Sequence, residues 1–445
     1  MTEAASRLPV SRLGGPDART VAKIDLGLSR RYAAERRFRA YGLAAVTIAI
    51  CFLLVLFGSI VSKGYTAFQQ TRVTMMVDFE PSIIAPDGDR SPKAIMSGNA
   101  FRFDDLIAAS LQKTLEIDPN DEDGLYDALD LLSKGSTPML RSMIANDPSL
   151  IGTKRTVDFY ATGDVDAFVK GTIRADVPES QRLIKDKHIV LIDKLKTEGA
   201  LHLAFNTGLF TNGASTRPET AGVGVALVGS LYMMLVVLVL SLPLGVAGSI
   251  YLEEFAPKNR WTDVIEVNIN NLAAVPSIVY GLLGLAVFIN FAHLPRSASL
   301  VGGLVLTLTT LPTIIITTRA ALKAVPPSIR EAGLGVGASK MQTVFHHVLP
   351  LAMPGVLTGT IIGLAHALGE TAPLLMIGMK AFIVEYPATP FDPATALPTQ
   401  IYMWATEPER AFTERTSAAI IVLLAFLLAM NSIAIILRRA FERRW

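Results

Sequence analysis

The stretch EAGLGVGASK, residues 331–340, has the residue types of a loop that holds nucleotide phosphates: three glycines, then a serine and a lysine. A nucleotide-binding loop of that kind has glycine directly before the lysine and serine or threonine directly after it. Here Ser339 precedes Lys340 and Met341 follows it. The spacing therefore excludes a nucleotide site in this stretch, and another role has to be found for it.

Catalytic and metal-binding patterns are missing from the rest of the sequence. It contains neither H-E-x-x-H nor G-x-S-x-G, the patterns of zinc proteases and serine hydrolases. The adjacent pair His346-His347 would point in different directions on a helix, and the other four histidines have no metal-ligand spacing. Cys51 is the only cysteine, so no intrachain disulfide can form. We expect no enzymatic activity in this chain, no cofactor, no metal and no nucleic-acid partner.

Ionisable side chains inside apolar segments are the second feature that could take part in chemistry, because such residues in membranes are rare and usually functional. Glu370, followed by Thr371, lies well inside the apolar stretch 352–379. The Glu370 carboxylate alone would repel an anion. It could be protonated, pair with a cation such as Arg319, or tie two helices together.

Arg319, Asn270 and Ser277 are the remaining candidates for a substrate path. Arg319 follows the apolar stretch 300–318, where its guanidinium could bind an oxyanion in bidentate fashion or anchor the helix end. Asn270 and Ser277 could replace part of an anion's hydration shell, or form hydrogen bonds between helices. The sequence leaves these alternatives open.

The elements that position these residues are long apolar blocks. The chain is 51% hydrophobic and only 18% charged, against about 25% charged residues in soluble domains. The apolar residues gather in blocks of about 20 residues or more, which is the length that crosses a bilayer. We predict an α-helical polytopic membrane protein with six transmembrane helices, over residues 41–62, 223–251, 264–291, 300–318, 352–379 and 417–437.

Positive charge predicts the orientation of these helices. The basic arm 1–40 has nine Arg and Lys residues and the segment 319–349 has four, whereas the short loop 292–299 has one. Because cytoplasmic loops carry the excess of Lys and Arg, we expect both termini in the cytoplasm.

The sequence divides into four parts. Residues 1–40 form a basic, poorly ordered cytoplasmic arm, residues 41–62 the first transmembrane helix, and residues 221–440 a transmembrane domain with a cytoplasmic loop at 324–350. Residues 63–220 are rich in charged and turn residues and predict an α+β periplasmic domain between the first two helices. Within it, 103–115 and 123–135 have helical spacing, whereas 153–162 and 188–192 resemble strands.

The loop 324–350 predicts two short helices that form an elbow between two membrane helices. Ser328 with Glu331, and Ser339 with Gln342, have the spacing of capping boxes. Gly337 lies between them, where a tight turn needs glycine. Leu349-Pro350 is expected to end the second helix and to lead back into the membrane. Such an elbow suits docking into a groove on a partner.

This loop resembles the signature loop of binding-protein-dependent ABC importer permeases, with departures at Gly333 and His347. In that family the loop is the coupling helix that contacts the ATPase subunit. The matching residues are Glu331, Ala332, Gly337, Leu349 and Pro350. The resemblance implies that ATP-driven closure of a partner is transmitted here to the membrane helices.

Three further segments resemble the permease subunits of ATP-driven phosphate importers, in the form with an extended N-terminal periplasmic domain: NNLAAVPSIVYGLLGL (270–285), HALGETAPLLMIG (366–378) and LPTQIYMWATEPERAF (397–412). The resemblance implies a place in the bacterial inner (plasma) membrane. It also implies four kinds of partner: two copies of an ATPase, a homologous second permease, a periplasmic phosphate-binding protein and membrane lipid. The periplasmic loops, including Gln400–Trp404, would meet the binding protein.

Two other functions compete with phosphate import. The physical reasoning does not separate phosphate from another oxyanion, such as sulfate or molybdate, or from another small solute. A membrane sensor would explain a periplasmic domain between two helices, but it would need a cytoplasmic signalling domain, and the largest cytoplasmic pieces expected here are the arm and the elbow.

Overall fold

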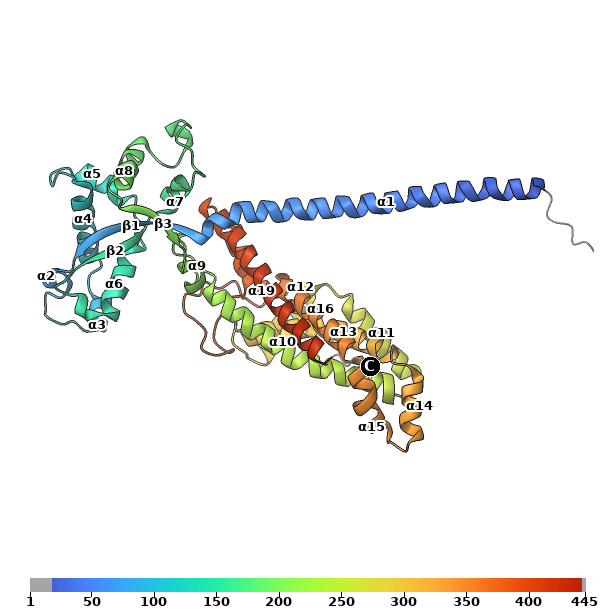
Figure 1. Cartoon of the computed structure of the whole chain (residues 1–445). Helices are drawn as coiled ribbons and strands as arrows, with labels where there is room; N and C mark the ends of the chain where they lie inside the picture. Colours follow the sequence, from blue (N-terminus) through green and yellow to red (C-terminus); the bar gives the residue numbers. More distant parts are fainter. Residues whose placement is uncertain (1–17, 442–445) are drawn as a thin grey trace, which may run out of the picture. The chain divides into compact units, whose positions relative to one another are not determined.

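Within the described residues, the first compact unit consists of one helix. The computed structural model describes the backbone of residues 18–441, in two compact units divided after Ser59. Helix α1 (Ala18–Gly64) makes up the first unit (Figure 1). It contains the apolar stretch 41–62 expected as a membrane helix. The arm was expected to be poorly ordered; from Ala18 onward its backbone is helical, and residues 1–17 lie outside the described residues.

The second unit begins with a small antiparallel sheet. Strands β1 (Gln69–Asp78), β2 (Lys154–Tyr160) and β3 (Leu201–Phe205) are arranged in the order β2-β1-β3. Helices connect and cover them: α2 (Pro81–Ile84), α3 (Pro92–Ser97), α4 (Phe101–Leu115), α5 (Glu122–Leu129), α6 (Ser136–Asn146), α7 (Gly163–Val169), α8 (Asp186–Thr197) and α9 (Gly208–Thr211). We call residues 65–220 the sheet block.

The core of the sheet block lies between one face of β1 and the helices. Val73, Met75 and Val77 alternate along the strand and are fully or almost fully buried, which is the period of a half-buried strand. The strand expected at 153–162 is confirmed as β2. The strand expected at 188–192 is wrong, because these residues belong to α8, whose Ile192 and Leu195 face the core at helical spacing.

The rest of the second unit is helical. Its long helices are α10 (Gly224–Ile250), α13 (Ser299–Lys323), α16 (Leu349–Gly369) and α19 (Ala411–Phe441). Shorter helices connect them: α11 (Arg260–Ala273), α12 (Ser277–Gly284), α14 (Pro327–Gly335), α15 (Lys340–Thr343), α17 (Ala372–Met376) and α18 (Leu397–Ala405). Among the described residues, five helices are long and apolar enough to cross a membrane, or six if the bent pair of α11 with α12 and its π-helical end counts as one span.

Small residues let the long helices pack closely. A Cβ atom at Gly303 of α13 would lie 2.6 Å from the Val236 side chain of α10, and one at Gly359 of α16 would lie 2.0 Å from Thr317 Oγ1. Close backbone approach at glycine is a common basis of helix association in membranes, where apolar burial alone gives little preference. The three helices therefore form the framework that positions both the elbow and the polar breaks described next.

Two expected membrane helices are interrupted. The stretch 264–291 is bent by 99° between Ala273 and Ser277, because Pro276 cannot donate a backbone hydrogen bond and directs the chain out of the helix. The stretch 352–379 is not one helix either: α16 ends at Gly369, and Glu370 has an extended backbone before α17 begins. Glu370 therefore lies at a helix end and not inside a helix.

Candidate functional site

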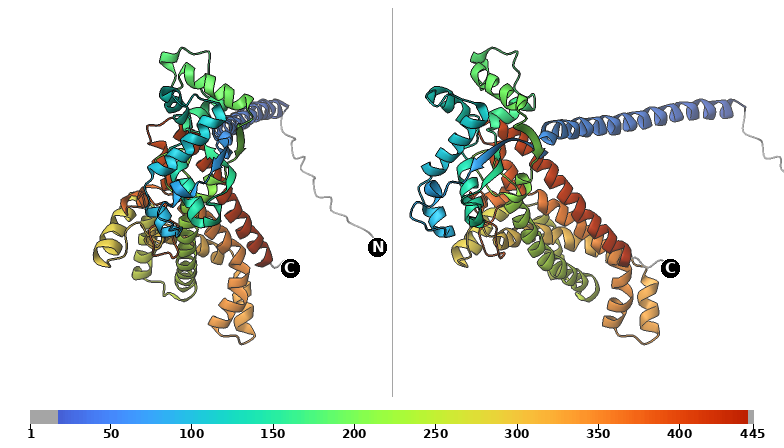
Figure 2. Two further views of the ribbon diagram at one scale, coloured as in Figure 1. Left: turned by 90° about the vertical axis from the view of Figure 1, so that its left-hand side faces the viewer. Right: turned by 60° about the vertical axis from the view of Figure 1, so that its left-hand side comes forward.

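The elbow projects from one end of the helical part. After α13, the chain forms α14, turns, and returns through α15 and a π-helical turn (Val344–Val348) that leads directly into α16. Figures 1 and 2 show α14 and α15 beyond the ends of the long helices. The expected helix end at Leu349-Pro350 is wrong, because the helix continues from Lys340 to Gly369. Pro350 has no backbone N–H to donate, and the π-helical turn just before it lets the helix continue without that hydrogen bond.

The turn between α14 and α15 has the predicted chemistry. Gly337 has φ of +89°, in the left-handed region that favours glycine. The second capping box is confirmed: the Ser339 backbone N–H donates to Gln342 Oε1 at 2.9 Å, and the Gln342 N–H donates to Ser339 Oγ at 3.2 Å. The first box is wrong, since Pro326 is the N-cap of α14 and Ser328 is already the second residue of the helix.

The departure from the family at Gly333 has a structural explanation. Gly333 is buried, and a Cβ atom there would lie 2.8 Å from the side chain of Thr343. The glycine therefore allows α14 to pack directly on α15.

Arg330 fastens this body to two long helices. Its guanidinium donates to both oxygens of Glu254 in the π-helical end of α10, through Nη2 at 2.7 Å and Nε at 3.1 Å to Oε1. It also donates to the carbonyls of Leu322 and Val325 at the end of α13, at 2.9 and 2.8 Å. The Glu254 side chain is only 7% exposed. Charge-assisted bidentate ion pairs of this kind fix the relative geometry of the two side chains and also add stability.

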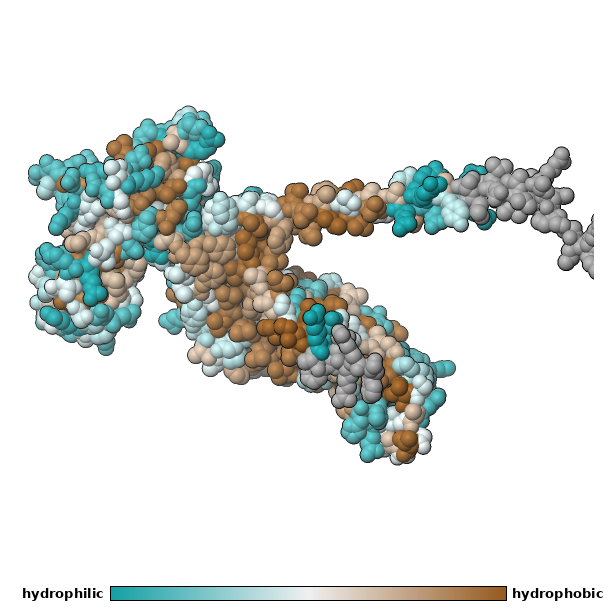
Figure 3. Space-filling model, in the orientation of Figure 1, coloured by the Kyte–Doolittle hydropathy of each residue, from teal (hydrophilic) through white to brown (hydrophobic). Residues whose placement is uncertain are grey.

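The tip of the elbow exposes apolar side chains. Val336 is 85% exposed, and Met341 and Leu334 are more than half exposed. Figure 3 shows apolar (brown) atoms beside hydrophilic ones at this end of the molecule. Because apolar patches rimmed by polar residues usually mark protein contacts, the tip is a candidate docking surface.

The structure brings the predicted loop residues to two places. Glu331, Ala332 and Gly337 are exposed on the elbow, whereas Leu349 and Pro350 are half-buried at the start of α16. The first three can therefore contact a partner directly. The other two lie where movement of the elbow would reach the long helix.

Arg319 is occupied by carboxylates. Its guanidinium forms an ion pair with Glu266 of α11 through Nη2, and its Nε lies 3.5 Å from Glu253, which also pairs with Lys323 at 3.6 Å. Among the described residues, Arg319 forms no ion pair with Glu370, which was one of the alternatives considered from the sequence. Arg319 therefore links α11, α13 and the end of α10. Sequence reasoning missed Glu266, although it lies inside an expected membrane helix and the criterion applied to Glu370 selects it.

Glu370 pairs with its own helix. Its carboxylate lies 3.1 Å from Nε2 of His366, one turn earlier. Thr371 is the N-cap of α17. α17 packs against α12, since a Cβ atom at Gly281 would lie 2.7 Å from Cα of Pro373. The break after α16 is therefore followed directly by α17, which contacts the broken helix formed by α11 and α12.

Asn270 and Ser277 lie on the two sides of the bend in that helix. Asn270 is exposed near the end of α11, and Ser277 is half-buried in the first turn of α12. Trp404, in the loop expected to meet a binding protein, is instead buried against Phe412 with ring centroids 6.1 Å apart.

Comparison with known proteins finds two matched regions. Residues 25–179 match the family described as "Domain of unknown function (DUF3333)", and residues 245–445 match "Binding-protein-dependent transport system inner membrane component". The "Probable ABC transporter permease protein YqgI" of Bacillus subtilis (strain 168) is 34% identical over 178 residues, which are 40% of this chain and 59% of that protein. The "Phosphate transport system permease protein PstA 1" of Mycobacterium tuberculosis (strain CDC 1551 / Oshkosh) is 33% identical over 229 residues, which are 51% of this chain and 74% of that protein. The chain belongs to the PstA-like permease family.

This permease is accordingly a multi-pass membrane protein. The transport-family match, residues 245–445, covers the helical part from the end of α10 onward, including the elbow. A methionine transporter, described as "Inward facing conformations of the MetNI methionine ABC transporter: CY5 SeMet soak crystal form", is 18% identical with a TM-score of 0.38, over 50% of this chain and 95% of that one. The aligned part spans 59% of the length of the Bacillus relative.

Proposed function

We propose that this chain is the membrane permease subunit of an ATP-driven importer of inorganic phosphate. The observation that carries the proposal is the elbow: a closely packed pair of helices with an apolar tip, on a chain whose Mycobacterium tuberculosis relative is named as a phosphate transport permease. The chain itself performs no catalysis in this account. ATP hydrolysis belongs to a separate subunit, present in two copies, on which Glu331, Ala332 and Gly337 would dock.

The elbow also supports an orientation. Arg330, Lys340 and the helix end with Arg319 lie at the same end of the helical part. Because positive charge collects on the cytoplasmic side, we place this end and both termini in the cytoplasm. The sheet block, residues 65–220 and close to the expected domain 63–220, would then be an α+β domain inserted between the first two membrane helices on the periplasmic side. A homologous second permease and a periplasmic phosphate-binding protein would complete the importer.

The two breaks are the proposed substrate path. Broken helices leave backbone polar groups without partners, which membranes tolerate only where these groups are buried in protein or line a cavity. Asn270 and Ser277 flank one break, and Glu370 and Thr371 form the other, on elements that pack together. Arg319 is the weaker candidate, because two carboxylates already neutralise its charge.

The test is uptake of labelled phosphate by cells that carry the gene or its deletion, with sulfate as a competitor. We expect uptake to fall on deletion and sulfate to have no effect. Uptake that sulfate suppresses would reassign the cargo to another oxyanion. Uptake unchanged by deletion, under conditions in which the gene is expressed, would contradict the proposal.

A further inference from the structure

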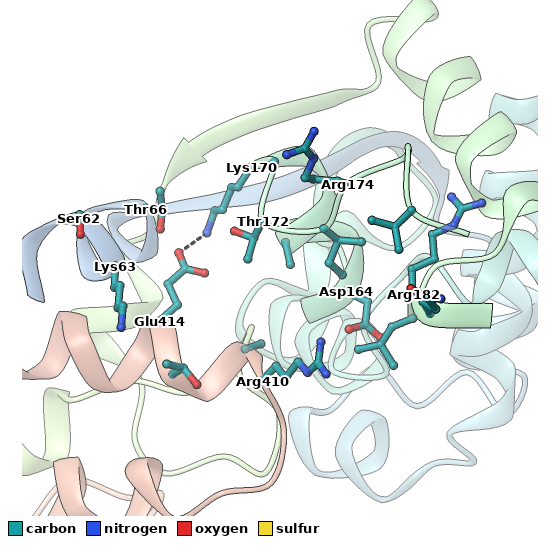
Figure 4. A pocket seen from close by; sticks show the side chains of 18 of the residues that line it. Ser62, Lys63, Thr66, Asp164, Lys170, Thr172, Arg174, Arg182, Arg410 and Glu414 are labelled. Carbon is teal, nitrogen blue, oxygen red and sulfur yellow. Dashed lines mark hydrogen bonds and ion pairs between the residues drawn. The ribbon is translucent and has the colours of Figure 1, made fainter. Parts of the chain in front are cut away.

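A cavity of about 590 Å³ lies at the base of the sheet block, within the second compact unit. Residues 62–66, the segment that follows α7 and the first turn of α19 form its walls (Figure 4). Its volume falls within the range of about 300–1,000 Å³ that is usual for small-molecule sites. None of the substrate-path candidates lines it, so it is distinct from the two breaks.

Cationic side chains dominate the charged part of the wall. Five line the cavity, against the two carboxylates of Asp164 and Glu414: Lys63, Lys170, Arg174, Arg182 and Arg410. Lys170 is fully engaged, because its Nζ lies 2.6 Å from Asp166 and 3.0 Å from Glu414, the latter drawn as a dashed line in Figure 4. Arg174 is paired with Asp176 at 2.7 Å.

The other three cations have unused capacity. Among the described residues, Lys63 and Arg410 have no ion-pair partner, and both are exposed to the cavity side. Arg182 pairs with Asp186 through Nη2 only. Its side chain is 5% exposed, and its Nε and Nη1 are buried without any hydrogen-bond partner. Buried donors of a charged group are costly to leave unsatisfied, so this guanidinium calls for an acceptor.

The acidic residues leave this positive excess in place. The Glu414 carboxylate is neutralised by Lys170. Burial raises the pKa of Asp164, which favours its neutral form, and a neutral carboxyl can donate a hydrogen bond. Thr66, Thr172 and Thr413 add hydroxyl groups to the wall.

We propose that this cavity binds a phosphate group, held by Arg182, Arg410 and Lys63. Guanidinium forks match the oxygens of phosphate in bidentate fashion, and an ammonium adds a point charge. Figure 4 shows Lys63 on one side of the cavity and Arg182 on the other, with Arg410 between them in this view. The inference goes beyond the proposed function and does not rest on it.

The place of the cavity allows two sources of that phosphate group. The apolar helix α19 begins at the cavity with Ala411, so the headgroup of an anionic phospholipid packed around that end of α19 can reach it. Inorganic phosphate from the surrounding solution carries the same chemistry. The volume of the cavity favours the larger headgroup.

Direct binding separates these cases without any need for transport. The full-length chain is purified into nanodiscs of phosphatidylcholine, and calorimetry follows titration with inorganic phosphate in one arm and with short-chain phosphatidylglycerol in the other. The variants are Lys63→Gln/Arg410→Gln, which changes two exposed side chains, and Arg182→Gln. Arg155→Gln is the matched control, because Arg155 is exposed on β2 and does not line the cavity.

We expect phosphatidylglycerol to bind, and both cavity variants to weaken it on the order of tenfold or more while the control binds as wild type does. The same pattern with inorganic phosphate also supports the site and identifies a soluble ligand. Binding of neither probe to the wild-type chain, or equal weakening by Arg155→Gln, would overturn the proposal. Thermal unfolding of each variant checks that it is folded. If Arg182→Gln is unfolded, the result with the double variant Lys63→Gln/Arg410→Gln decides the question.

Discussion

Replacing Arg330 by glutamine should detach the elbow from the membrane helices. The guanidinium donates to Glu254 and to the carbonyls of Leu322 and Val325, all near the joint between the elbow and α10 and α13. Glutamine keeps much of the volume but loses the charge, and leaves the Glu254 carboxylate buried and unpaired. Removing one partner of such a pair costs about 3–5 kcal/mol. That cost would raise the population of a detached elbow by about two to nearly four orders of magnitude.

The assay is ATP-dependent phosphate uptake, together with ATP hydrolysis, by the assembled transporter in proteoliposomes. We expect Arg330→Gln to hydrolyse ATP but to transport little phosphate, because the motion of the partner no longer reaches α10 and α13. Lys323→Gln is the control: its side chain is 58% exposed and 3.6 Å from Glu253, so its loss should cost at most about 1 kcal/mol.

A double variant tests the physical reason directly. Glu254→Gln combined with Arg330→Gln removes both charges, so no unpaired carboxylate remains, and transport should recover in part. Wild-type transport by Arg330→Gln would refute the role of this ion pair. A double variant as impaired as the sum of the two single variants would refute the argument from an unpaired buried charge.

Three further changes have defined outcomes. Gly337→Ala should lower coupled transport, because alanine at a positive φ costs about 1–2 kcal/mol, whereas Gly335→Ala in the helix should not; equal transport rates would contradict this. Lys170→Met should destabilise the junction of the sheet block with α19 by about 3–5 kcal/mol, since the Glu414 carboxylate loses its partner; an unchanged thermal midpoint would argue against it. Because the folded pKa of Asp164 is raised above its ordinary 3.8, the protonated folded form loses stability as pH rises through that raised pKa, so Asp164→Asn should raise the thermal midpoint at neutral pH but not in acid; a gain at both would refute the sign.

The long helices and the turn of the elbow were predictable because their causes are local. Helices α10, α13 and α19 follow from runs of apolar residues long enough to cross a bilayer. The box formed by Ser339 and Gln342 and the positive φ of Gly337 depend on residues within a few positions of one another. Such features need no knowledge of the rest of the fold.

Three predictions were wrong because another local signal in the sequence determined the structure. Pro326 and Pro327 start α14 earlier than the Ser328 box predicts, because proline is favoured in the first turn of a helix. Pro276 bends an apolar stretch that length alone reads as one helix. The short apolar run at 188–192 fits both strand and helix, and packing of α8 onto the sheet decides between them.

The partners of the candidate residues could not be predicted, because they come from distant parts of the chain. Glu254 lies 76 positions from Arg330, and Glu266 lies 53 positions from Arg319. The sequence shows that each of these residues is ionisable and near an apolar block, but not which of them meet. Arg319 illustrates this. Two carboxylates match its charge, which favours a link between helices over an anion site.

Phosphate accumulation in proteoliposomes tests the central claim most directly. The vesicles contain this chain with its second permease, ATPase and phosphate-binding protein, with ATP on the side of the elbow. We predict that labelled phosphate accumulates against its gradient only with ATP, that excess sulfate does not reduce it, and that omission of this chain abolishes it. Accumulation without this chain, or of sulfate in place of phosphate, would contradict the account.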